Sequence, residues 1–285
     1  KFEEIVKQLI FQAISDTGIK KITITGGCAM NSVCNGKLHK WYPSCDFYIP
    51  PYPDDSGISI GAAIIGSKEM CDPISKIDKK NYIYTGHDYD RNEILDCIKE
   101  SGLDFKDNRE NWSNIARLIS EGNLIGFFNG KSEFGQRALG NRSILGDPRK
   151  LETKTLLNKA VKYREEFRPF APAVLKEYAH QIFENYVDSY FMERVLEVKI
   201  QWRSKIPAVV HFDNTARLQT VSKDINGNFY KLIAAFHQIT GIPLLVNTSF
   251  NLNGEPNVEN PRDAIRTFFS CGLDYLLLGQ FLISK

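Results

Sequence analysis

The chain has 285 residues, and its content of 42% hydrophobic and 25% charged residues is that of an ordinary globular protein with room for two domains. Its formal net charge of only +2 argues against a general nucleic-acid-binding protein, because such proteins are usually basic throughout. The sequence contains no apolar run of about 18 residues, so we predict no membrane-spanning helix.

The first part of the chain is expected to be an α/β unit. Apolar spacing and β-branched runs predict helices at 2–15, 30–39 and 59–65 and strands at 21–25 and 46–50. Gly26 and Gly27 directly follow the first strand and precede a helix. Such a turn binds anions in some proteins and only permits close packing in others, and the sequence leaves both readings open.

Asp54 and Asp55 stand in a proline-rich loop directly before the helix predicted at 59–65. A side chain at this place can cap the helix, and a carboxylate there can also bind a hard metal ion. The polar stretch at 68–90 then predicts a domain boundary near residue 80, which divides the chain into domains at 1–80 and 81–285.

The second domain is expected to mix helices and strands. The predicted helices span 91–100, 111–121, 150–162, 176–184, 229–240 and 261–270. The predicted strands span 124–128, 190–200, 208–212, 243–251 and 273–283. This alternation indicates the α/β or α+β class. The six cysteines show neither a CxxC pair nor zinc-site spacing, so we expect reduced thiols in a cytoplasmic protein.

Positive charge is concentrated in one segment of the second domain. Residues 131–168 hold ten Lys or Arg against five Asp or Glu, a local surplus larger than that of the whole chain. Arg137 and Arg142 lie there with Gly140 between them, and arginine forks beside glycines suit phosphate or carboxylate ligands. The alternative is a solvated basic surface. The alternation of these arginines with Phe, Leu, Gly and Pro favours a partly enclosed site.

Further polar side chains follow other predicted strands. Arg217 comes after the strand predicted at 208–212, and Asn247, Ser249 and Asn251 follow a buried apolar run. Ligands of α/β proteins commonly bind at strand ends, so these groups are expected to converge with the basic segment.

Several of these stretches resemble one known family. They are GKSEFGQRALGNRSILGDPR at 130–149, KYREEFRPFAP at 162–172, ARLQT at 216–220 and NTSFN at 247–251, followed by GEP at 254–256 and PRDA at 261–264. In this order they resemble the O-carbamoyltransferases of the nodulation-protein U, cephalosporin and tobramycin type. The resemblance covers nearly the whole chain.

The resemblance implies both a fold and a reaction. The expected fold is the C-terminal part of an actin-like (Kae1-like) domain followed by a YrdC-like α/β domain. The YrdC-like domain would make carbamoyl adenylate from carbamoyl phosphate and ATP, with loss of pyrophosphate. The Kae1-like domain would pass the carbamoyl group to a small-molecule acceptor hydroxyl. Mg²⁺ would accompany ATP, and an iron-type divalent metal would belong to the full-length Kae1-like domain.

The resemblance also assigns residues. The carbamoyl phosphate and ATP site would comprise Arg137, Lys162, Arg168, Arg217 and Ser249, with Arg142, Asn247 and Asn251 as neighbours. The nucleotide-binding turn of the Kae1-like part would comprise Gly26, Gly27 and Asn31. The metal-ligating aspartate would be Asp55.

One feature of the family is missing. Its metal site needs two histidines spaced i, i+4 on a helix, and the five histidines here, at 39, 87, 180, 211 and 237, form no such pair. We therefore interpret the chain as a fragment without the front half of the acceptor domain. We expect no membrane and no nucleic-acid partner, and a homodimer is compatible with the sequence. The alternatives are a YrdC-like RNA-binding module and a threonylcarbamoyl-adenylate synthase.

Overall fold

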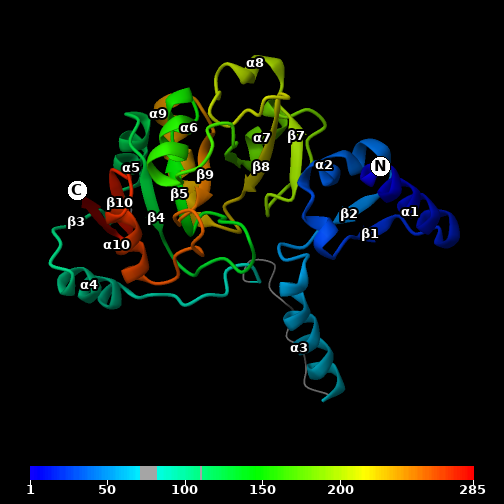
Figure 1. Cartoon of the computed structure of the whole chain (residues 1–285), viewed down its shortest axis with the longest axis horizontal. Coiled ribbons are helices and arrows are strands. Elements are labelled where there is room, and N and C mark those ends of the chain that lie inside the picture. Colours follow the sequence, from blue (N-terminus) through cyan, green and yellow to red (C-terminus); the bar gives the residue numbers. More distant parts are fainter. Residues whose placement is uncertain (71–81, 110) are drawn as a thin grey trace.

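The computed structural model describes residues 1–70, 82–109 and 111–285, and it contains two units, each with its own sheet. Figure 1 shows the smaller unit in blue at the N-terminal end and the larger one beside it. The boundary predicted near residue 80 lies outside the described residues. The described helices include none with the length and apolar character needed to cross a bilayer.

The N-terminal unit is small and built around two parallel strands. Its strands are β1 (Lys21–Thr23) and β2 (Asp46–Tyr48), its helices α1 (Phe2–Thr17), α2 (Ser32–Trp41) and α3 (Ile58–Glu69), and its 3-10 turns η1 (Gly27–Met30) and η2 (Asp55–Gly57). These elements confirm the predicted pattern to within a few residues. The helix predicted at 30–39 begins at Ser32, because Asn31 caps it.

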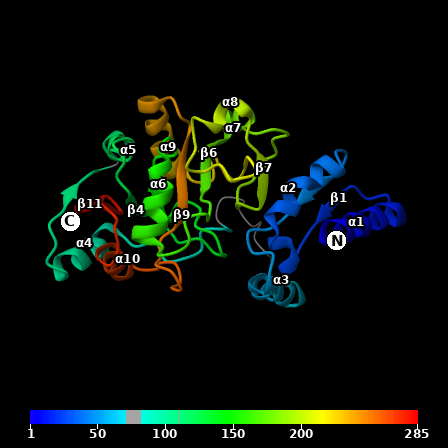
Figure 2. The ribbon, with the colours of Figure 1, turned by 45° about the horizontal axis from the view of Figure 1, so that its top comes forward.

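Two helices of this unit leave apolar side chains uncovered. Helix α3 has no buried residue, although its sequence is mostly apolar, and Figures 1 and 2 show it projecting from the rest of the molecule. Large exposed apolar side chains on α1 and α3 are Phe2, Ile5, Leu9, Phe11, Ile58, Ile64 and Ile65. Apolar surface of this extent is what a further packing partner would cover.

The larger unit is a mixed sheet of nine strands in the order β3-β11-β10-β4-β5-β9-β6-β8-β7. The strands are β3 (Lys106–Asp107), β4 (Ile125–Phe128), β5 (Arg142–Gly146), β6 (Ala171–Leu175), β7 (Arg194–Glu197), β8 (Thr215–Val221), β9 (Leu244–Ser249), β10 (Tyr275–Leu278) and β11 (Phe281–Ser284). The β4–β10 and β6–β8 pairs are parallel and the others antiparallel. The predicted mixed α/β class is therefore confirmed.

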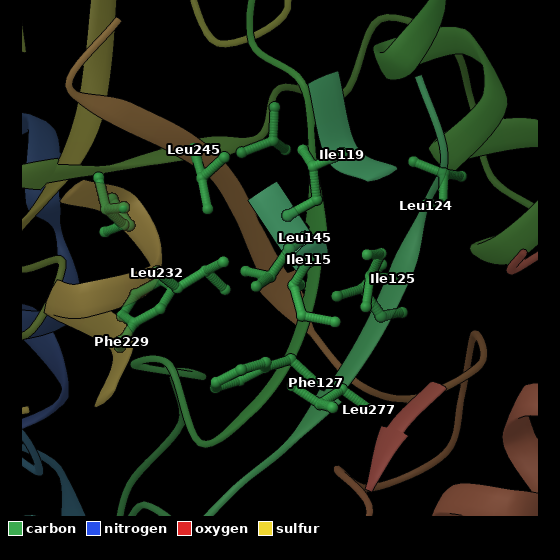
Figure 3. Packing of buried hydrophobic residues seen from close by; sticks show 14 of the residues in the cluster. Ile115, Ile119, Leu124, Ile125, Phe127, Leu145, Phe229, Leu232, Leu245 and Leu277 are labelled. Carbon is green, nitrogen blue, oxygen red and sulfur yellow. The ribbon is translucent and has the colours of Figure 1, made fainter. Parts of the chain in front are cut away.

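Helices pack on this sheet and bury its apolar side chains. They are α4 (Arg91–Glu100), α5 (Trp112–Ser120), α6 (Leu151–Leu156), α7 (Lys176–Ile182), α8 (Ile200–Arg203), α9 (Gly227–Thr240) and α10 (Pro261–Phe269), with a π-helical turn η3 (Leu157–Val161) after α6. Figure 3 shows Ile115 and Ile119 of α5 beside Phe229 and Leu232 of α9, over strand side chains such as Phe127. Burial of these side chains supplies most of the favourable free energy of folding.

Several of the strand predictions need correction. The run at 208–212 forms turns and bends, and the strand lies at 215–221 instead. Ala208 and Val209 are buried there as loop residues, so their apolar character indicated burial and not a strand. The strand predicted at 273–283 is a hairpin, because Gly279 (φ 59°) turns the chain between β10 and β11. The basic loop also contains strand β5, which the pattern did not predict.

The register of the sheet brings several strand ends to one edge. Arg142, the first residue of β5, lies opposite Phe128, the last residue of β4. Ser249, the last residue of β9, lies opposite Ser143. Because β6 is antiparallel to β9 and parallel to β8, the first residues of β6 and β8 lie at this edge as well. The loops before β5 and β6 therefore meet the end of β9.

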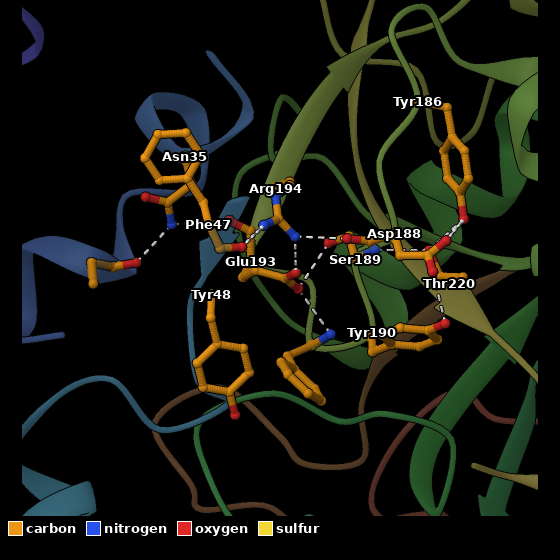
Figure 4. A network of polar contacts seen from close by, with 12 residues as sticks. Asn35, Phe47, Tyr48, Tyr186, Asp188, Ser189, Tyr190, Glu193, Arg194 and Thr220 are labelled. Carbon is orange, nitrogen blue, oxygen red and sulfur yellow. Dashed lines mark hydrogen bonds and ion pairs between the residues drawn. The ribbon is translucent and has the colours of Figure 1, made fainter. Parts of the chain in front are cut away.

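The N-terminal unit is joined to strand β7 by buried polar contacts. The Arg194 guanidinium donates to the Phe47 carbonyl oxygen at 3.0 Å, and the Asn35 amide donates to the Glu193 carbonyl oxygen at 3.0 Å. Figure 4 shows Asn35 and Phe47 of the N-terminal unit on one side of Glu193 and Arg194. Buried, satisfied networks of this kind fix the relative position of the groups they join.

Replacing Gly36 by alanine is expected to disturb this junction. A Cβ at Gly36 would lie 1.8 Å from the Val195 carbonyl oxygen, so α2 could no longer approach β7 as closely. Overpacking of this kind destabilises proteins by about 1–3 kcal/mol. The matched control is Gly61→Ala in α3, where no atom lies within 4 Å of the added Cβ. Thermal unfolding should show a lower Tm for Gly36→Ala only, and equal Tm values would contradict the described packing.

Candidate anion-binding site

A pocket of about 120 Å³ lies at this edge of the large sheet. Its lining residues are Gln136, Arg137, Ala138, Arg164, Pro169, Phe170, Ala171, Met192, Arg217, Asn247, Thr248 and Ser249. The lining contains three arginines and four neutral polar side chains, but no carboxylate. Because nothing acidic neutralises the guanidinium groups within the pocket, it is suited to an anion.

Arg217 reaches the pocket from strand β8 and is its most enclosed cation. Its Nε is buried without a hydrogen-bond partner. Burial, together with the charges of Arg137 and Arg164, lowers the pKa of Arg217 to about 10. Burial also lowers the pKa of Arg137. A bound anion would relieve the repulsion between these guanidinium groups and satisfy their donors.

A buried carboxylate shapes the loop that carries Arg137. Glu133 Oε1 accepts hydrogen bonds from the backbone N–H groups of Leu139 (2.7 Å), Asn141 (2.7 Å) and Arg142 (3.2 Å). Burial raises the pKa of Glu133 above its ordinary value despite these bonds. These bonds close the loop on Glu133. Arg137 lies within the closed loop, between Glu133 and the backbone N–H groups that Glu133 binds.

The Arg142 side chain supports this loop and does not line the pocket. Its guanidinium lies 3.5 Å from the centre of the Phe128 ring and is fully buried. It donates to the carbonyl oxygens of Asn129 (3.2 Å) and Gly130 (2.9 Å). Of the two arginines in this motif, Arg137 therefore lines the pocket and Arg142 does not.

Lys162 lies behind Ser249 and is not among the residues that line the pocket. Its Nζ donates to the Ser249 carbonyl oxygen (2.6 Å) and Oγ (3.2 Å), and to the Asn251 carbonyl oxygen (2.9 Å) and Oδ1 (2.7 Å). Burial, with a contribution from Arg164, lowers the pKa of Lys162 to about 7. Ser249 lines the pocket, whereas Asn251 and Lys162 do not line it and are hydrogen-bonded to Ser249.

Asn247 lines the pocket from strand β9 and links it to the adjoining loop. Its Nδ2 donates to the Ala138 carbonyl oxygen at 3.1 Å and to Gln219 Oε1 at 2.8 Å. Its Oδ1 is buried and has no partner, which leaves one acceptor available. A ligand that carries an N–H donor beside its negative charge would match this combination.

Two arginines of the following motif have different positions. Arg168 is exposed and forms an ion pair with Glu165 at 2.8 Å, and it is not among the residues that line the pocket. Arg164 does line it, although sequence reasoning counted it only toward the local charge and did not select it. Both arginines belong to one sequence motif, so the sequence alone did not indicate which of them lines the pocket.

Two of the four sequence-predicted residues of the N-terminal unit line a second pocket, of about 420 Å³. Gly26 and Asp55 both line it, together with Asp54. Gly26 (φ 91°) donates its N–H to the Pro53 carbonyl oxygen at 2.6 Å. Gly27 begins η1 and Asn31 caps α2 through Cys34, and neither lines this pocket.

Among the described residues, Asp55 has no set of further metal ligands around it. In the residues that the structure describes, no three His, Cys, Asp or Glu side chains are grouped as they would be around a metal ion. The neighbouring Asp54 accepts hydrogen bonds from Gln136 and from Ser56 Oγ, the latter at 2.6 Å. The donors present therefore do not fit a complete metal site.

The anion pocket continues toward the N-terminal unit. Gln136, Arg137 and Met192 line both this pocket and a narrow crevice formed with prolines 51 and 53 and other residues of the N-terminal unit. The Arg137 side chain therefore separates the anion pocket from the junction of the two units.

Comparison with known proteins identifies the family to which this arrangement belongs. The model of the carbamoyltransferase C-terminus matches residues 116–285, more than half of the chain, and that of the carbamoyltransferase N-terminus matches residues 2–64. The chain belongs to the carbamoyltransferase family. The family predicted from the motifs is thus confirmed, and all three arginines of the pocket fall within the C-terminal match.

Curated relatives of this carbamoyltransferase chain match it along most of its length. Nodulation protein NolNO of Sinorhizobium fredii is 40% identical over 99% of this chain and 43% of its own length. Nodulation protein NolO of Bradyrhizobium diazoefficiens is 38% identical over 99% and 53%, and Nodulation protein U of Sinorhizobium fredii is 33% identical over 83% and 40%. The chain spans about half the length of these relatives.

Solved structures show a more distant likeness. The crystal structure of full-length HypF in its phosphate- and nucleotide-bound form is 13% identical at a TM-score of 0.40, over 80% of this chain and 35% of that protein.

Proposed function

We propose that this carbamoyltransferase chain forms carbamoyl adenylate from carbamoyl phosphate and ATP in the pocket lined by Arg137, Arg164 and Arg217. The observation that carries the proposal is the set of three guanidinium groups without a carboxylate among the lining residues. Each hydrogen bond from a cation to a phosphate oxygen contributes about 1.5–3 kcal/mol, so three such groups suffice to hold a phosphorylated substrate.

The polar lining also suits the carbamoyl group. Its amide N–H can donate to Asn247 Oδ1, which has no partner, and the Ser249 hydroxyl lies on the same strand. Release of phosphate from carbamoyl phosphate by water leaves carbamate. The carbamate oxygen then attacks the α-phosphorus of ATP, the bond to the β-phosphate oxygen breaks, and pyrophosphate leaves. Joining two anions in this step requires cations held in place beforehand.

No protein nucleophile is needed for this reaction. Arg217 and Arg137 would bind and align the anionic reactants, and Lys162 would add positive charge from behind Ser249. Mg²⁺ would reach the site bound to ATP and would neutralise part of the triphosphate charge. Arg168, exposed beside this loop, would be available to the triphosphate outside the pocket.

The acceptor reaction would need more polypeptide than this chain provides. We interpret residues 1–80 as the C-terminal part of a Kae1-like domain and residues 81–285 as a YrdC-like domain that transfers its product to an acceptor hydroxyl. The uncovered apolar side chains of α1 and α3 and the incomplete ligand set at Asp55 support this interpretation. Gly26 and Asp55, which share a pocket, would belong to that acceptor site.

The test is pyrophosphate release by the purified chain with carbamoyl phosphate, ATP and Mg²⁺. The control is the double variant Arg137→Ala, Arg217→Ala, which removes two of the three pocket cations. We expect release that depends on carbamoyl phosphate and is lost in the double variant. Pyrophosphate at the level of the control would contradict the proposal. Release that requires threonine and bicarbonate instead would identify a threonylcarbamoyl-adenylate synthase.

The enclosure of the three cations in a pocket favours this reaction over RNA binding. A duplex contacts protein over an extended basic face, whereas here the cations lie in a pocket of about 120 Å³ at a sheet edge. RNA binding that falls steeply with salt, without any binding of ATP or phosphate, would support the RNA-binding alternative.

A further inference from the structure

The segment between Lys162 and Arg168 carries both positive and negative side chains, but only a positive one, Arg164, lines the pocket. It carries Glu165 and Glu166 as well as Arg164, so either carboxylate could neutralise that arginine. Neither does. Glu165 binds Arg168 at 2.8 Å, and Glu166 binds Lys159 at 2.6 Å. Both nearby acidic groups are thus paired elsewhere, and the Arg164 guanidinium faces the pocket without a carboxylate contact among the described residues.

A single buried amide controls this arrangement. Asn158 is fully buried, and its Oδ1 accepts from Arg164 Nε at 2.8 Å. Its Nδ2 donates to the carbonyl oxygens of Glu166 (3.3 Å) and Arg168 (3.1 Å), and its own carbonyl oxygen accepts from the Arg164 N–H at 3.0 Å. Every hydrogen-bonding group of the Asn158 side chain therefore holds the segment at 164–168.

The local backbone explains why Asn158 can do this. Helix α6 widens into the π-helical turn η3, in which the Lys162 N–H bonds to the Leu157 carbonyl oxygen at 2.8 Å. Tyr163 then adopts a left-handed conformation (φ 46°), which turns the chain back over Asn158. π-Helical turns and strained residues of this kind are common at functional sites.

The opposite face of the guanidinium is also fixed. Arg164 Cζ lies 4.8 Å from the centre of the Phe170 ring, and Phe170 itself lines the pocket. Since Nε is bound to Asn158 and one face rests on Phe170, the terminal NH groups of Arg164 are the ones left for a ligand.

We propose that Arg164 is a third anion-binding residue of the pocket and that Asn158 is the positioning residue that aims it. This proposal rests on the proposed function, because it assigns Arg164 to the phosphate group of the same substrate. Arg137 and Arg217 approach from the loop before β5 and from β8, so Arg164, from the turn after η3, completes the set of cations from a third segment.

The test measures binding of inorganic phosphate and of carbamoyl phosphate by calorimetry. Arg164→Gln is expected to raise both Kd values about tenfold to hundredfold, which corresponds to one charged hydrogen-bonded group. Arg164→Lys keeps the charge and should recover part of this loss. The matched control is Arg262→Gln, since Arg262 is exposed and pairs with Glu100 at 2.7 Å on another part of the surface. It should bind phosphate like the unmodified chain.

A double-mutant cycle separates positioning from general support. Asn158→Ala alone should weaken phosphate binding, but it should add little in the Arg164→Gln background, because it acts through Arg164. Fully additive effects would contradict the role of Asn158, and unchanged binding by Arg164→Gln would contradict the whole inference even if Asn158→Ala does not fold. If Arg137→Gln and Arg217→Gln lose binding while Arg164→Gln does not, the proposed function survives and only this inference fails. If the unmodified chain binds no phosphate, the proposed function fails with it.

Discussion

Replacing Arg217 by methionine is expected to weaken phosphate binding about tenfold to hundredfold and, in the same protein, to stabilise the unliganded chain. Arg217 Nε is buried without a partner, and the neighbouring Arg137 and Arg164 repel its charge. Methionine keeps most of the length of the side chain and removes the charge. Replacing buried ion pairs by apolar side chains is often neutral or stabilising by about 1–4 kcal/mol. Here no carboxylate among the lining residues would lose its partner.

Opposite changes in binding and stability are the signature of a group retained for a ligand. Calorimetry with phosphate and thermal unfolding without ligand measure the two effects separately. The matched control is Arg203→Met, because the Arg203 guanidinium is satisfied by the Val198 carbonyl oxygen at 2.8 Å and by Glu197 at 3.0 Å. That variant should lose stability and keep its phosphate affinity. A destabilised Arg217→Met variant with unchanged affinity would show that Arg217 serves the fold instead.

Much of the fold could be predicted from apolar periodicity, and the errors have physical causes. Helices such as α4 and α9 have one apolar face and clear capping residues, so their limits were predicted to within a few residues. The run at 208–212 is equally apolar but is buried as a loop, and β-branched composition cannot distinguish that case from a strand. The hairpin between β10 and β11 was missed because one glycine marks its turn.

The site was harder to predict than the fold, because the same residue type serves two purposes in one motif. Arg137 and Arg142 look alike in sequence, yet the first lines the pocket and the second lies on Phe128 beneath the loop. Similarly, Arg164 enters the pocket and Arg168 pairs with Glu165 outside it. Which arginine lines the pocket depends on ion pairs and on the π-helical turn before Arg164, and the sequence pattern did not indicate either. Arg137, Arg217, Asn247 and Ser249 were nevertheless predicted to converge and do share the pocket, although Arg217 lies near the start of β8 and not after a strand at 208–212.

Sulfate binding to the pocket is expected to weaken by about tenfold or more as the pH rises above 7, because Lys162 loses its proton. Burial and the charge of Arg164 lower the pKa of Lys162 from 10.5 to about 7. A bound anion on the far side of Ser249 favours the charged lysine, and an opposite charge nearby raises such a pKa by about one to three units. By linkage, each unit by which bound sulfate raises the pKa of Lys162 corresponds to about a tenfold loss of sulfate affinity once Lys162 of the free chain has lost its proton. Sulfate is the suitable probe because it does not titrate in this range.

The sign for stability is opposite to the sign for binding. Between pH 7 and 10.5 the unfolded chain holds more protons on Lys162 than the folded chain does, so the contribution of Lys162 to stability rises with pH in this window. The stability of the unliganded chain relative to Lys162→Met should therefore rise with pH between 7 and 10.5, and Lys162→Met should bind sulfate weakly at every pH. Burial raises the pKa of the nearby Cys271 thiol above its ordinary value. The matched control is Lys205→Met, whose ammonium lies over Trp202, remote from the pocket lining. An affinity for sulfate that stays constant from about pH 6 to about pH 9, or that falls equally in Lys162→Met, would rule out Lys162 as the titrating group.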